Sequence, residues 1–311
     1  MPPESFDRRA IPGSAAFSTW AASDGWPIRL LDWPQEARRK VRGSLLFANG
    51  RGDFIEKYLE ADAYWHARGW DVTAFDWRGQ GGSRGTIAGG HLDSFDPLVD
   101  DLAGLIADWR ARTPAPHVAI GHSMGGHLLL RTLAERRPAL DAAVLVAPMV
   151  RINSGALPDW AAHWTASAMS AFGLADHPAW EGSKMPAPAG SLRQSILTAS
   201  HERYEDELWW WRKEPGFNLG APSWGWLRAA FASSGRLTPE RLRAIEIPVL
   251  LLGTERDRLV SPAAIRDAAA TIPNAELLML DDAAHEILRE ADKVRLRAFA
   301  AIDAFLDAHA P

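Results

Sequence analysis

The chain contains no cysteine among its 311 residues. Disulfides, catalytic thiolates and cysteine-ligated metals are therefore excluded, and the composition fits a reducing compartment. No stretch approaches the 18 or more uninterrupted apolar residues of a membrane-spanning helix. The first charged residues are not followed by the apolar segment of a secretory signal. We expect a soluble, cytoplasmic protein whose contact with a membrane, if there is one, is peripheral and on the inner face.

Long runs of positive charge are absent as well. The net charge is −5, and the longest basic run is Arg38-Arg39-Lys40, so nucleic acid is not an expected partner. Hydrophobic residues make up 47% of the chain. That share is enough to bury a sizeable core, either in one large domain or in a domain with an insertion.

Strand and helix patterns alternate in the first half of the chain, which predicts an α/β fold with a mostly parallel sheet. The expected strands there are 28–32, 44–48, 70–75, 117–121 and 142–147. The expected helices are 55–68, 95–112 and 124–136. After the helix start at Thr238-Pro239-Glu240, the pattern predicts strands at 248–252 and 275–280 and helices at 262–271 and 292–308.

The alternation stops between these two parts. Residues 151–236 show no clear strand pattern and hold eight of the fifteen tryptophans. These are Trp160, Trp164, Trp180, Trp209, Trp210, Trp211, Trp224 and Trp226. We therefore predict a core formed by residues 1–150 and 237–311, interrupted by a largely helical, tryptophan-rich cap at 151–236.

One serine lies between a predicted strand and a predicted helix. The segment Gly121-His122-Ser123-Met124-Gly125 fits G-x-S-x-G, the nucleophile elbow. The sharp turn needs glycine two residues away on each side of the serine, because a Cβ there would crowd the backbone. The turn also places the amide of Met124 at the positive end of the helix, where it can donate to an oxyanion. The alternative is an ordinary glycine-rich turn between a strand and a helix.

A serine nucleophile needs a general base and a group that orients this base. Asp257 follows the predicted strand 248–252, and His285 follows the predicted strand 275–280. The three residues therefore follow one another along the chain as serine, acid and histidine, which is the order in α/β-hydrolases. The carboxyl ends of parallel strands are where such sheets assemble their sites. We predict Ser123, Asp257 and His285 as the catalytic residues.

Other acids near these loops are alternatives to Asp257, which could also be solvated in its charged turn. They are Glu255, Asp281 and Asp282. The pair His285-Glu286 does not extend to the zinc motif H-E-x-x-H, because Arg289 occupies the last position. The second oxyanion donor is expected in the glycine-rich loop after strand 44–48, where we assign the backbone amide of Arg51.

The chain resembles the serine α/β-hydrolase family of monoacylglycerol lipases and bacterial lysophospholipases. The resemblance rests on the segments FANGRGDFIEKY, FDWRGQGGSRG, GHLDSFDPLVDDL, GHSMGG and AAHEILRE. The chain departs from the lipases at Asn49-Gly50, where they carry His-Gly. Gly50-Arg51 and the segment WWWRKEPGFNLGAPSWGWLR are closer to the lysophospholipase branch. The resemblance implies an α/β-hydrolase fold and hydrolysis of acyl-lipid esters through an acyl-enzyme, with no metal or organic cofactor.

An aromatic cap over the serine would supply apolar walls for an acyl chain, at about 0.8 kcal/mol per buried CH₂. The candidate substrate-binding residues are Trp209, Trp210, Trp211, Trp224 and Trp226. Tryptophans in a small helical domain can equally serve its own core. Three adjacent residues on a helix do not share one face, so at least one of the first three should point to the substrate, the main domain or a membrane.

The expected partner is thus a small-molecule acyl ester. Short-chain carboxylesterase, thioesterase and lactonase activities are alternatives, since one scaffold hosts many chemistries. A ligand-binding protein on an inactive hydrolase fold is a further alternative. It would have no need to keep all three candidate catalytic residues.

Overall fold

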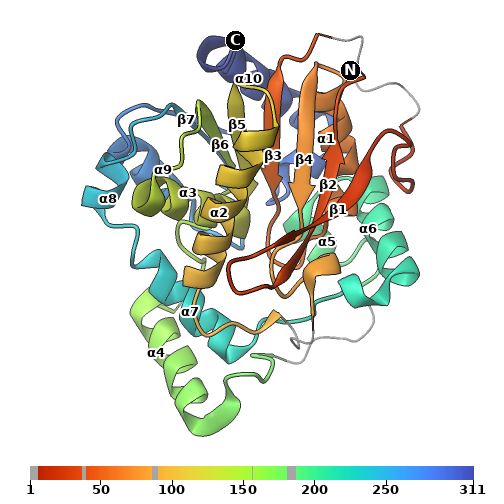
Figure 1. Cartoon of the computed structure of the whole chain (residues 1–311). Helices are drawn as coiled ribbons and strands as arrows, with labels where there is room; N and C mark the ends of the chain where they lie inside the picture. The colour runs from red at the N-terminus through yellow and green to blue at the C-terminus, as the bar shows by residue number, and fades with distance from the viewer. Residues whose placement is uncertain (1–5, 37–39, 86–89, 156, 181–186) are drawn as a thin grey trace.

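The computed structural model describes residues 6–36, 40–85, 90–155, 157–180 and 187–311. Arg38 and Arg39 of the basic run lie outside them. An eight-stranded sheet with the order β1-β2-β4-β3-β5-β6-β7-β8 forms the centre of the protein (Figure 1). β1 and β2 pair antiparallel, as do β2 and β4, and the other neighbours are parallel. The strands are β1 (Ala16–Ala21), β2 (Pro27–Trp33), β3 (Gly43–Ala48), β4 (Trp70–Phe75), β5 (His117–His122), β6 (Ala142–Val146), β7 (Val249–Gly253) and β8 (Ala275–Met279).

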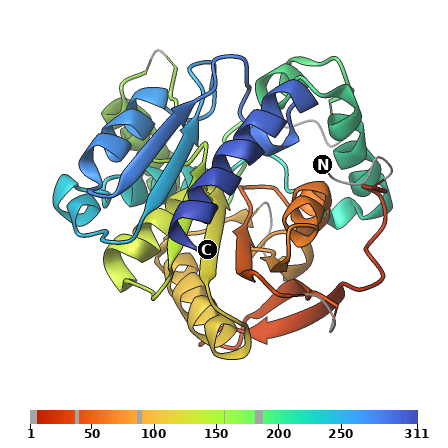
Figure 2. The ribbon, with the colours of Figure 1, turned by 90° about the horizontal axis from the view of Figure 1, so that it is seen from above.

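Helices cover both faces of the sheet (Figure 2). Outside the stretch between β6 and β7 they are η1 (Ile55–Tyr58), α1 (Leu59–His66), η2 (Gly81–Ser83), α2 (Asp96–Arg112), α3 (Met124–Arg136), α9 (Pro262–Thr271), η6 (Ile287–Arg289) and α10 (Asp292–His309). Two hydrophobic cores result because side chains alternate along each strand. Leu45 and Phe47 face the core of α1 and α10, whereas Leu46 and Ala48 face the core of α2, α3 and α9.

The predicted elements agree with these bounds within a few residues, with two differences. β1 was not predicted. The expected helix 55–68 begins as the 3₁₀ turn η1 and becomes α-helical only at Leu59. The amide of Ile55 donates to the side chain of Asp76 (2.9 Å), so a tertiary contact shapes the start of this segment.

Between β6 and β7 the described residues form no named strand. The helices there are α4 (Asp159–Met169), η4 (Ser170–Leu174), α5 (Leu192–Leu197), α6 (His201–Lys213), η5 (Pro215–Phe217), α7 (Trp224–Ser234) and α8 (Pro239–Arg243). We call residues 151–236 the inserted segment. It begins and ends at the main domain, and α4 projects at the lower end of Figure 1. Thr238 caps α8 by accepting from the amide of Arg241, as its Thr-Pro-Glu start predicts.

The inserted segment is fixed to the main domain at α6 and at α7. Arg203 of α6 donates two hydrogen bonds to Glu60 of α1, at 2.7 and 2.9 Å. Ser233 of α7 contacts the first turns of α3, with its hydroxyl 2.6 Å from His127 Nε2 and 2.9 Å from Arg131 Nη1. Burial lowers the pKa of His127 to about 3, so its ring is neutral at this junction.

Candidate active site

Ser123 occupies the turn between β5 and α3 in a strained backbone conformation, with φ at 52° and ψ at −115°. Positive φ is rare for residues with a side chain and costs about 1–3 kcal/mol. Contacts across the turn hold it in place. The amide of Ser123 donates to Val146 O (2.9 Å), and its carbonyl accepts from the amide of Met149 (2.9 Å). The strain presents the hydroxyl at the end of the sheet.

The glycines of the elbow are required by close backbone approach. A Cβ on Gly121 would lie 2.8 Å from Gly125 O, and a Cβ on Gly125 would lie 2.2 Å from Ala48 O. Both contacts are with backbone, which cannot rotate away. The G-x-S-x-G pattern is therefore a packing requirement of this turn and not an ordinary glycine-rich connection.

His285 lies between Ser123 and Asp257. Its Nε2 is 2.9 Å from Ser123 Oγ, and its Nδ1 is 2.7 Å from Asp257 Oδ2. Asp257 also accepts the amides of Leu259 (2.8 Å) and Val260 (3.0 Å) on its other oxygen. The structure thus brings together the three residues predicted from separate loops. Asp257 and His285 are buried, whereas Ser123 is partly accessible.

The alternative acids lie elsewhere. Glu255 pairs with Arg266, and Asp282 pairs with Arg297 at 2.8 Å. Burial alone would raise the pKa of Asp257, but the charge and hydrogen bond of His285 outweigh it and the pKa is lowered. For His285, burial alone would lower the pKa, and Asp257 outweighs it in the opposite direction, so the pKa is raised. The pair therefore favours an ionised Asp257 that stabilises an imidazolium.

The loop after β3 passes directly against the elbow. A Cβ on Gly50 would lie 3.2 Å from Ser123 Cβ and 3.1 Å from His122 Nδ1, so only glycine fits there without displacing its neighbours. The residue before Arg51 therefore lies against the nucleophile. Met124 is the first residue of α3, and its amide has no acceptor within the helix. Both assigned oxyanion donors thus belong to segments next to Ser123.

The loop after β4 supports the loop after β3. Trp77 Nε1 donates to Asn49 O (2.7 Å), and Gln80 Nε2 donates to Gly50 O (2.8 Å). Gln80 also accepts the amide of Gly52 at 3.2 Å. The FDWRGQGGSRG segment of the family resemblance therefore fixes the path of the backbone beside the serine.

The five candidate tryptophans lie in different surroundings. Trp226 is buried, 5.5 Å from the ring of Phe95, and the guanidinium of Arg51 lies 5.0 Å from its ring centre. Arg51 also donates to Gly220 O at 3.1 Å. Trp226 is therefore linked to the loop beside Ser123. Trp224 begins α7 and is partly buried.

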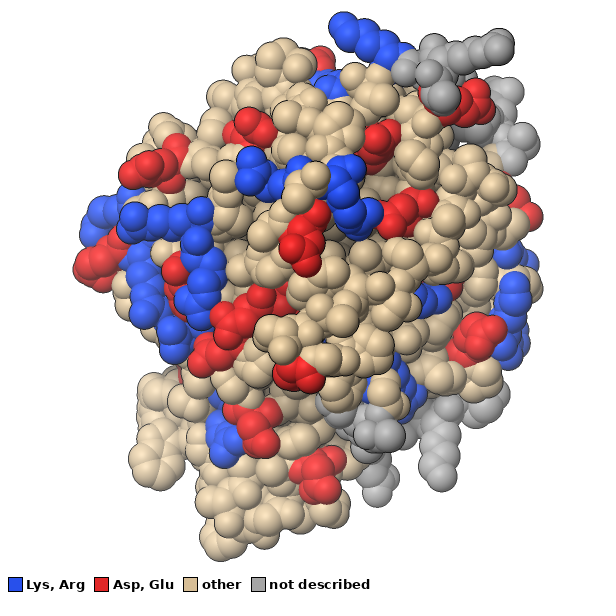
Figure 3. All heavy atoms as spheres, in the orientation of Figure 1, with Lys and Arg blue, Asp and Glu red and all other residues tan. Residues whose placement is uncertain are grey.

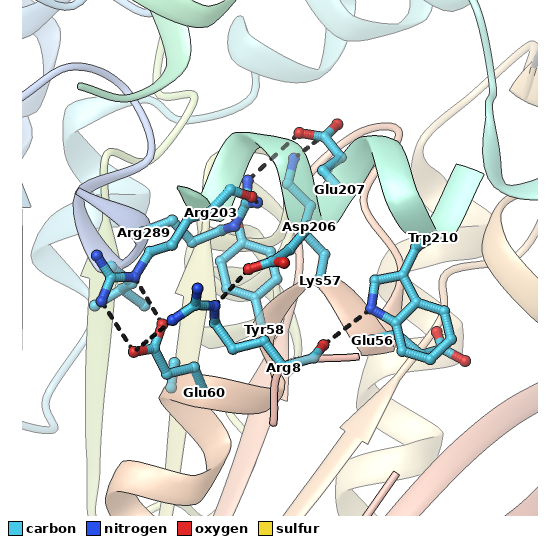
Figure 4. Close-up of a pocket in the computed structure, with 12 residues that line it drawn as sticks. Arg8, Glu56, Lys57, Tyr58, Glu60, Arg203, Asp206, Glu207, Trp210 and Arg289 are labelled. Atoms are coloured by element: carbon cyan, nitrogen blue, oxygen red, sulfur yellow. Dashed lines mark hydrogen bonds and ion pairs between the residues drawn. The ribbon is translucent and has the colours of Figure 1, made fainter. Parts of the chain in front are cut away.

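The three adjacent tryptophans of α6 belong to the core shared with α1. Trp210 and Trp211 are buried, and Trp209 packs against the same core. Trp210 Nε1 donates to Arg8 O at 3.1 Å, as Figure 4 shows. Arg9 lies over the ring of Trp209, and Arg193 lies over that of Trp211. The contacts of these three rings are thus with the N-terminal segment and with neighbouring side chains of the main domain and inserted segment.

Sequence reasoning missed a set of buried polar residues behind the site. His122, next to Ser123, has Nδ1 at 2.9 Å from the hydroxyl of Tyr58 and Nε2 at 3.4 Å from His285 O. Asp53, Lys57 and Glu286 lie beside them. The i, i+4 spacing of Asp53 and Lys57 was the one local signal, and it does not indicate burial. No group of three or more His, Asp or Glu side chains that could hold a metal ion occurs among the described residues.

Comparisons with known proteins identify the family of this chain. A family model described as serine aminopeptidase, S33, matches residues 39–292. The chain is 30% identical to a probable lysophospholipase L2 of Haemophilus influenzae, over 90% of this chain and 87% of that protein. It is 28% identical to lysophospholipase L2 of Escherichia coli K12, over 92% and 86%. It is 25% identical to a monoacylglycerol lipase of Mycolicibacterium smegmatis, over 81% and 84%.

Among solved structures, the chain resembles a soluble variant of monoglyceride lipase from Saccharomyces cerevisiae in complex with a substrate analogue. The TM-score is 0.73 at 17% identity, covering 99% of this chain and 100% of that one. At this identity the likeness shows the fold, and it is the α/β-hydrolase fold expected from the sequence. The resemblance to lysophospholipases and monoacylglycerol lipases is confirmed, and the chain belongs to the S33 serine aminopeptidase family of α/β-hydrolases.

Proposed function

We propose that this protein hydrolyses carboxylic esters of acyl lipids, with Ser123 as nucleophile, His285 as general base and Asp257 as the residue that orients it. The observation that carries the proposal is the continuous chain of contacts from Ser123 Oγ to His285 (2.9 Å) and from His285 to Asp257 (2.7 Å). The nucleophile is strained and partly accessible, whereas its two partners are buried. This is the arrangement that activates a hydroxyl which is a weak nucleophile by itself.

The reaction then proceeds in two halves. His285 takes the proton of Ser123 as the oxygen attacks the ester carbonyl, and Asp257 stabilises the imidazolium. The amides of Met124 and Arg51 donate to the tetrahedral oxyanion. His285 passes the proton to the leaving alcohol, and an acyl-enzyme remains. Water repeats the sequence on the acyl-enzyme and releases the fatty acid.

The inserted segment serves as a cap in this proposal, with its boundaries at 151 and 236. We assign Trp226 to the wall of the acyl site, because its ring contacts the guanidinium of Arg51, whose neighbour Gly50 lies against Ser123. The relatives at 28–30% identity are named lysophospholipases, which favours a lysophospholipid over a neutral monoacylglycerol. Trp209, Trp210 and Trp211 would then support α6 from behind and not contact the acyl chain, given their surroundings.

An exposed aromatic surface on α4 and η4 extends the proposal to a lipid surface. Trp160 and Trp164 lie one turn apart on α4 and are 69% and 73% exposed, and Phe172 of η4 is 82% exposed. We call these three residues the aromatic tip. The surface over α4 and η4 carries few charged side chains (Figure 3). Exposed apolar patches mark interaction sites, and tryptophan suits the boundary between lipid and water. No helix among the described residues is long and apolar enough to cross a membrane.

The first test is fatty-acid release from a lysophosphatidylcholine, a monoacylglycerol of the same acyl chain and a short-chain ester. Wild type should cleave the long-chain lipids, and Ser123→Ala should lower kcat by roughly 10⁴- to 10⁶-fold. Ser18→Ala is a matched control, because Ser18 lies on the exposed edge strand β1 and its hydroxyl donates to Asp32 at 3.0 Å, away from the candidate site. Cleavage of the short ester alone would replace the lipid substrate by a general esterase. A Ser123→Ala variant as active as wild type would refute the nucleophile.

A further inference from the structure

A buried lysine connects two of the loops that build the candidate site. Lys57 is on η1, and its side chain is 3% exposed. Its ammonium donates to Asp53 Oδ1 and to Glu286 Oε1, both at 2.6 Å. Lys57 and Glu286 are 229 residues apart in the chain. We call Asp53, Lys57 and Glu286 the lysine bridge.

Each end of the lysine bridge reaches a loop with a proposed catalytic role. The second carboxylate oxygen of Asp53 accepts the amide of Gly50 at 2.9 Å, next to Arg51. Glu286 directly follows His285, and its amide donates to Leu197 O at 2.8 Å. The bridge therefore fixes the distance between the loop that supplies an oxyanion donor and the loop that supplies the base.

The elbow contacts the same cluster. The hydroxyl of Tyr58 donates to Asp53 at 3.1 Å and lies 2.9 Å from His122 Nδ1. His122 precedes Ser123, and its other nitrogen lies 3.4 Å from His285 O. The nucleophile loop, the base loop and the oxyanion loop thus meet on one set of buried polar side chains.

The lysine bridge also continues into the inserted segment. Glu207 of α6 lies 3.4 Å from the ammonium of Lys57, and Arg289 of η6 pairs with both Glu286 and Glu207. Arg193 forms a further ion pair with Glu207, with its Nη2 2.7 Å from Glu207 Oε1. Figure 4 shows Lys57, Glu207 and Arg289 at the interface where α6 lies over η1. Burial by itself would neutralise Glu286, but Lys57 and Arg289 outweigh it and hold its pKa at about 2.

We propose that Lys57 is a positioning residue, which holds the Gly50–Arg51 loop and His285 in register through Asp53 and Glu286. The proposal rests on the function proposed above, because it assigns catalytic work to His285. Lys57 makes no contact with the reacting atoms in this role. It acts by geometry and by balancing two carboxylates that face the base.

The charge balance gives the proposal a distinctive readout. Three sets of groups face His285: Asp257 from the loop after β7, Glu286 and Asp53 of the bridge, and Ser123 and His122 from the elbow. Asp257, Glu286 and Asp53 all raise the pKa of His285. Removing the Lys57 charge leaves two of these carboxylates less compensated and should raise the pKa of His285 further. Removing the Glu286 charge should lower it.

The experiment compares Lys57→Met, Lys57→Arg and Glu286→Gln with wild type between pH 5 and pH 9. The three measured quantities are kcat and KM for a short-chain ester and the rate at which a fluorophosphonate labels Ser123. Lys57→Met should lower kcat by roughly 10- to 100-fold with a smaller change in KM, since slight misplacement of reacting groups is costly. In a plot of kcat/KM against pH, the acid limb reports the pKa of His285. For Lys57→Met this limb should move to higher pH by about half a unit, and for Glu286→Gln it should move to lower pH. Lys57→Arg should return the limb towards wild type.

Glu60→Gln is the matched control for loss of a buried ion pair. Glu60 pairs with Arg203 and Arg295 one turn further along the same segment, and it is not a member of the lysine bridge. This variant should lose stability but keep the wild-type pH profile. If Lys57→Met does not fold, as judged by circular dichroism, the isosteric Glu286→Gln still tests the proposal. The acid limb of its pH–rate profile should move to lower pH.

Three results are decisive. Opposite shifts for Lys57→Met and Glu286→Gln, with rescue by Lys57→Arg, support the proposal. Wild-type kcat and limb positions in both variants overturn it while leaving the proposed function intact. A wild-type protein whose Ser123 neither reacts with the probe nor turns over ester overturns the proposed function, and the bridge then positions no catalytic base.

Discussion

Two helices of the inserted segment reverse the usual rule that charged residues are exposed and apolar residues are buried. Helix α6, with the sequence HERYEDELWWWRK, is rich in charge and yet largely buried. Helix α4, with the sequence DWAAHWTASAM, has one acid and no Lys or Arg, and Ala166 is its one buried residue. The buried helix is stabilised by ion pairs to the main domain. The apolar helix is left exposed.

This difference shows that the tryptophans of the segment have at least two roles. Trp210 is 3% exposed and contributes to a core, whereas Trp164 is 73% exposed and contributes to none. An apolar helix gains nothing in stability from facing water, so its exposure supports the lipid surface proposed above as its partner. The charge-rich helix is held by the main domain, because its buried charged residues Arg203, Asp206 and Glu207 are already paired there.

The comparison between α6 and α4 is tested most directly by replacing a tryptophan with alanine in each helix. Trp210→Ala should lower the free energy of unfolding by about 3–5 kcal/mol, because it leaves a cavity between α6 and α1. Trp160→Ala should change it by no more than about 0.5 kcal/mol, because the ring is already in solvent. Urea denaturation followed by circular dichroism measures both. Equal losses at the two positions would contradict the comparison.

A smaller effect is expected from breaking an ion pair of the buried helix. Arg203→Met approximates the volume of the side chain but removes two hydrogen bonds to Glu60 and one each to Asp292, Glu290 O and Ser200. The loss should be about 2–3 kcal/mol, because Glu60 keeps Arg295 as a partner. Arg136→Met, at an exposed pair with Asp100, should cost about 1 kcal/mol or less. An Arg203 variant as stable as the Arg136 variant would remove the ion pairs from this explanation.

The smallest effect is expected at the aromatic tip. The double variant Trp160→Ala/Trp164→Ala should bind phosphatidylcholine vesicles about tenfold more weakly than wild type, as measured by co-sedimentation. High salt should not weaken wild-type binding, because burial of apolar surface is not screened. Phe17→Ala is the control, since Phe17 is an exposed aromatic residue on β1, away from the tip. Unchanged vesicle binding by the double variant would show that the tip serves another partner.

Much of the fold was predictable because its signals are local. Strands such as β3 and β5 are short apolar runs, and α3 begins and ends at the predicted residues. β1 was missed because nearly all of its residues are exposed, so it shows no alternation of buried and exposed positions. An edge strand that packs against little has no hydrophobic pattern to detect.

The candidate site also has residues that local sequence predicts and residues that it does not. Ser123, Asp257 and His285 were placed by their position after predicted strands, which is information carried by a few neighbouring residues. The lysine bridge was not predictable, because Lys57 meets Glu286 and Glu207 only through the tertiary fold. A lysine next to an acid in sequence is usually solvated, and nothing local distinguishes one that is buried.

The close approach of Gly50 to the elbow sets a limit on redesign of this enzyme. Position 50 is closed to any larger side chain, because a single added carbon would meet Asp53, His122 and Ser123. Position 51 is different, because its guanidinium lies 5.0 Å from the ring centre of Trp226. Under the proposed function, position 50 must therefore stay glycine for turnover, whereas a change of side chain at position 51 should alter substrate preference.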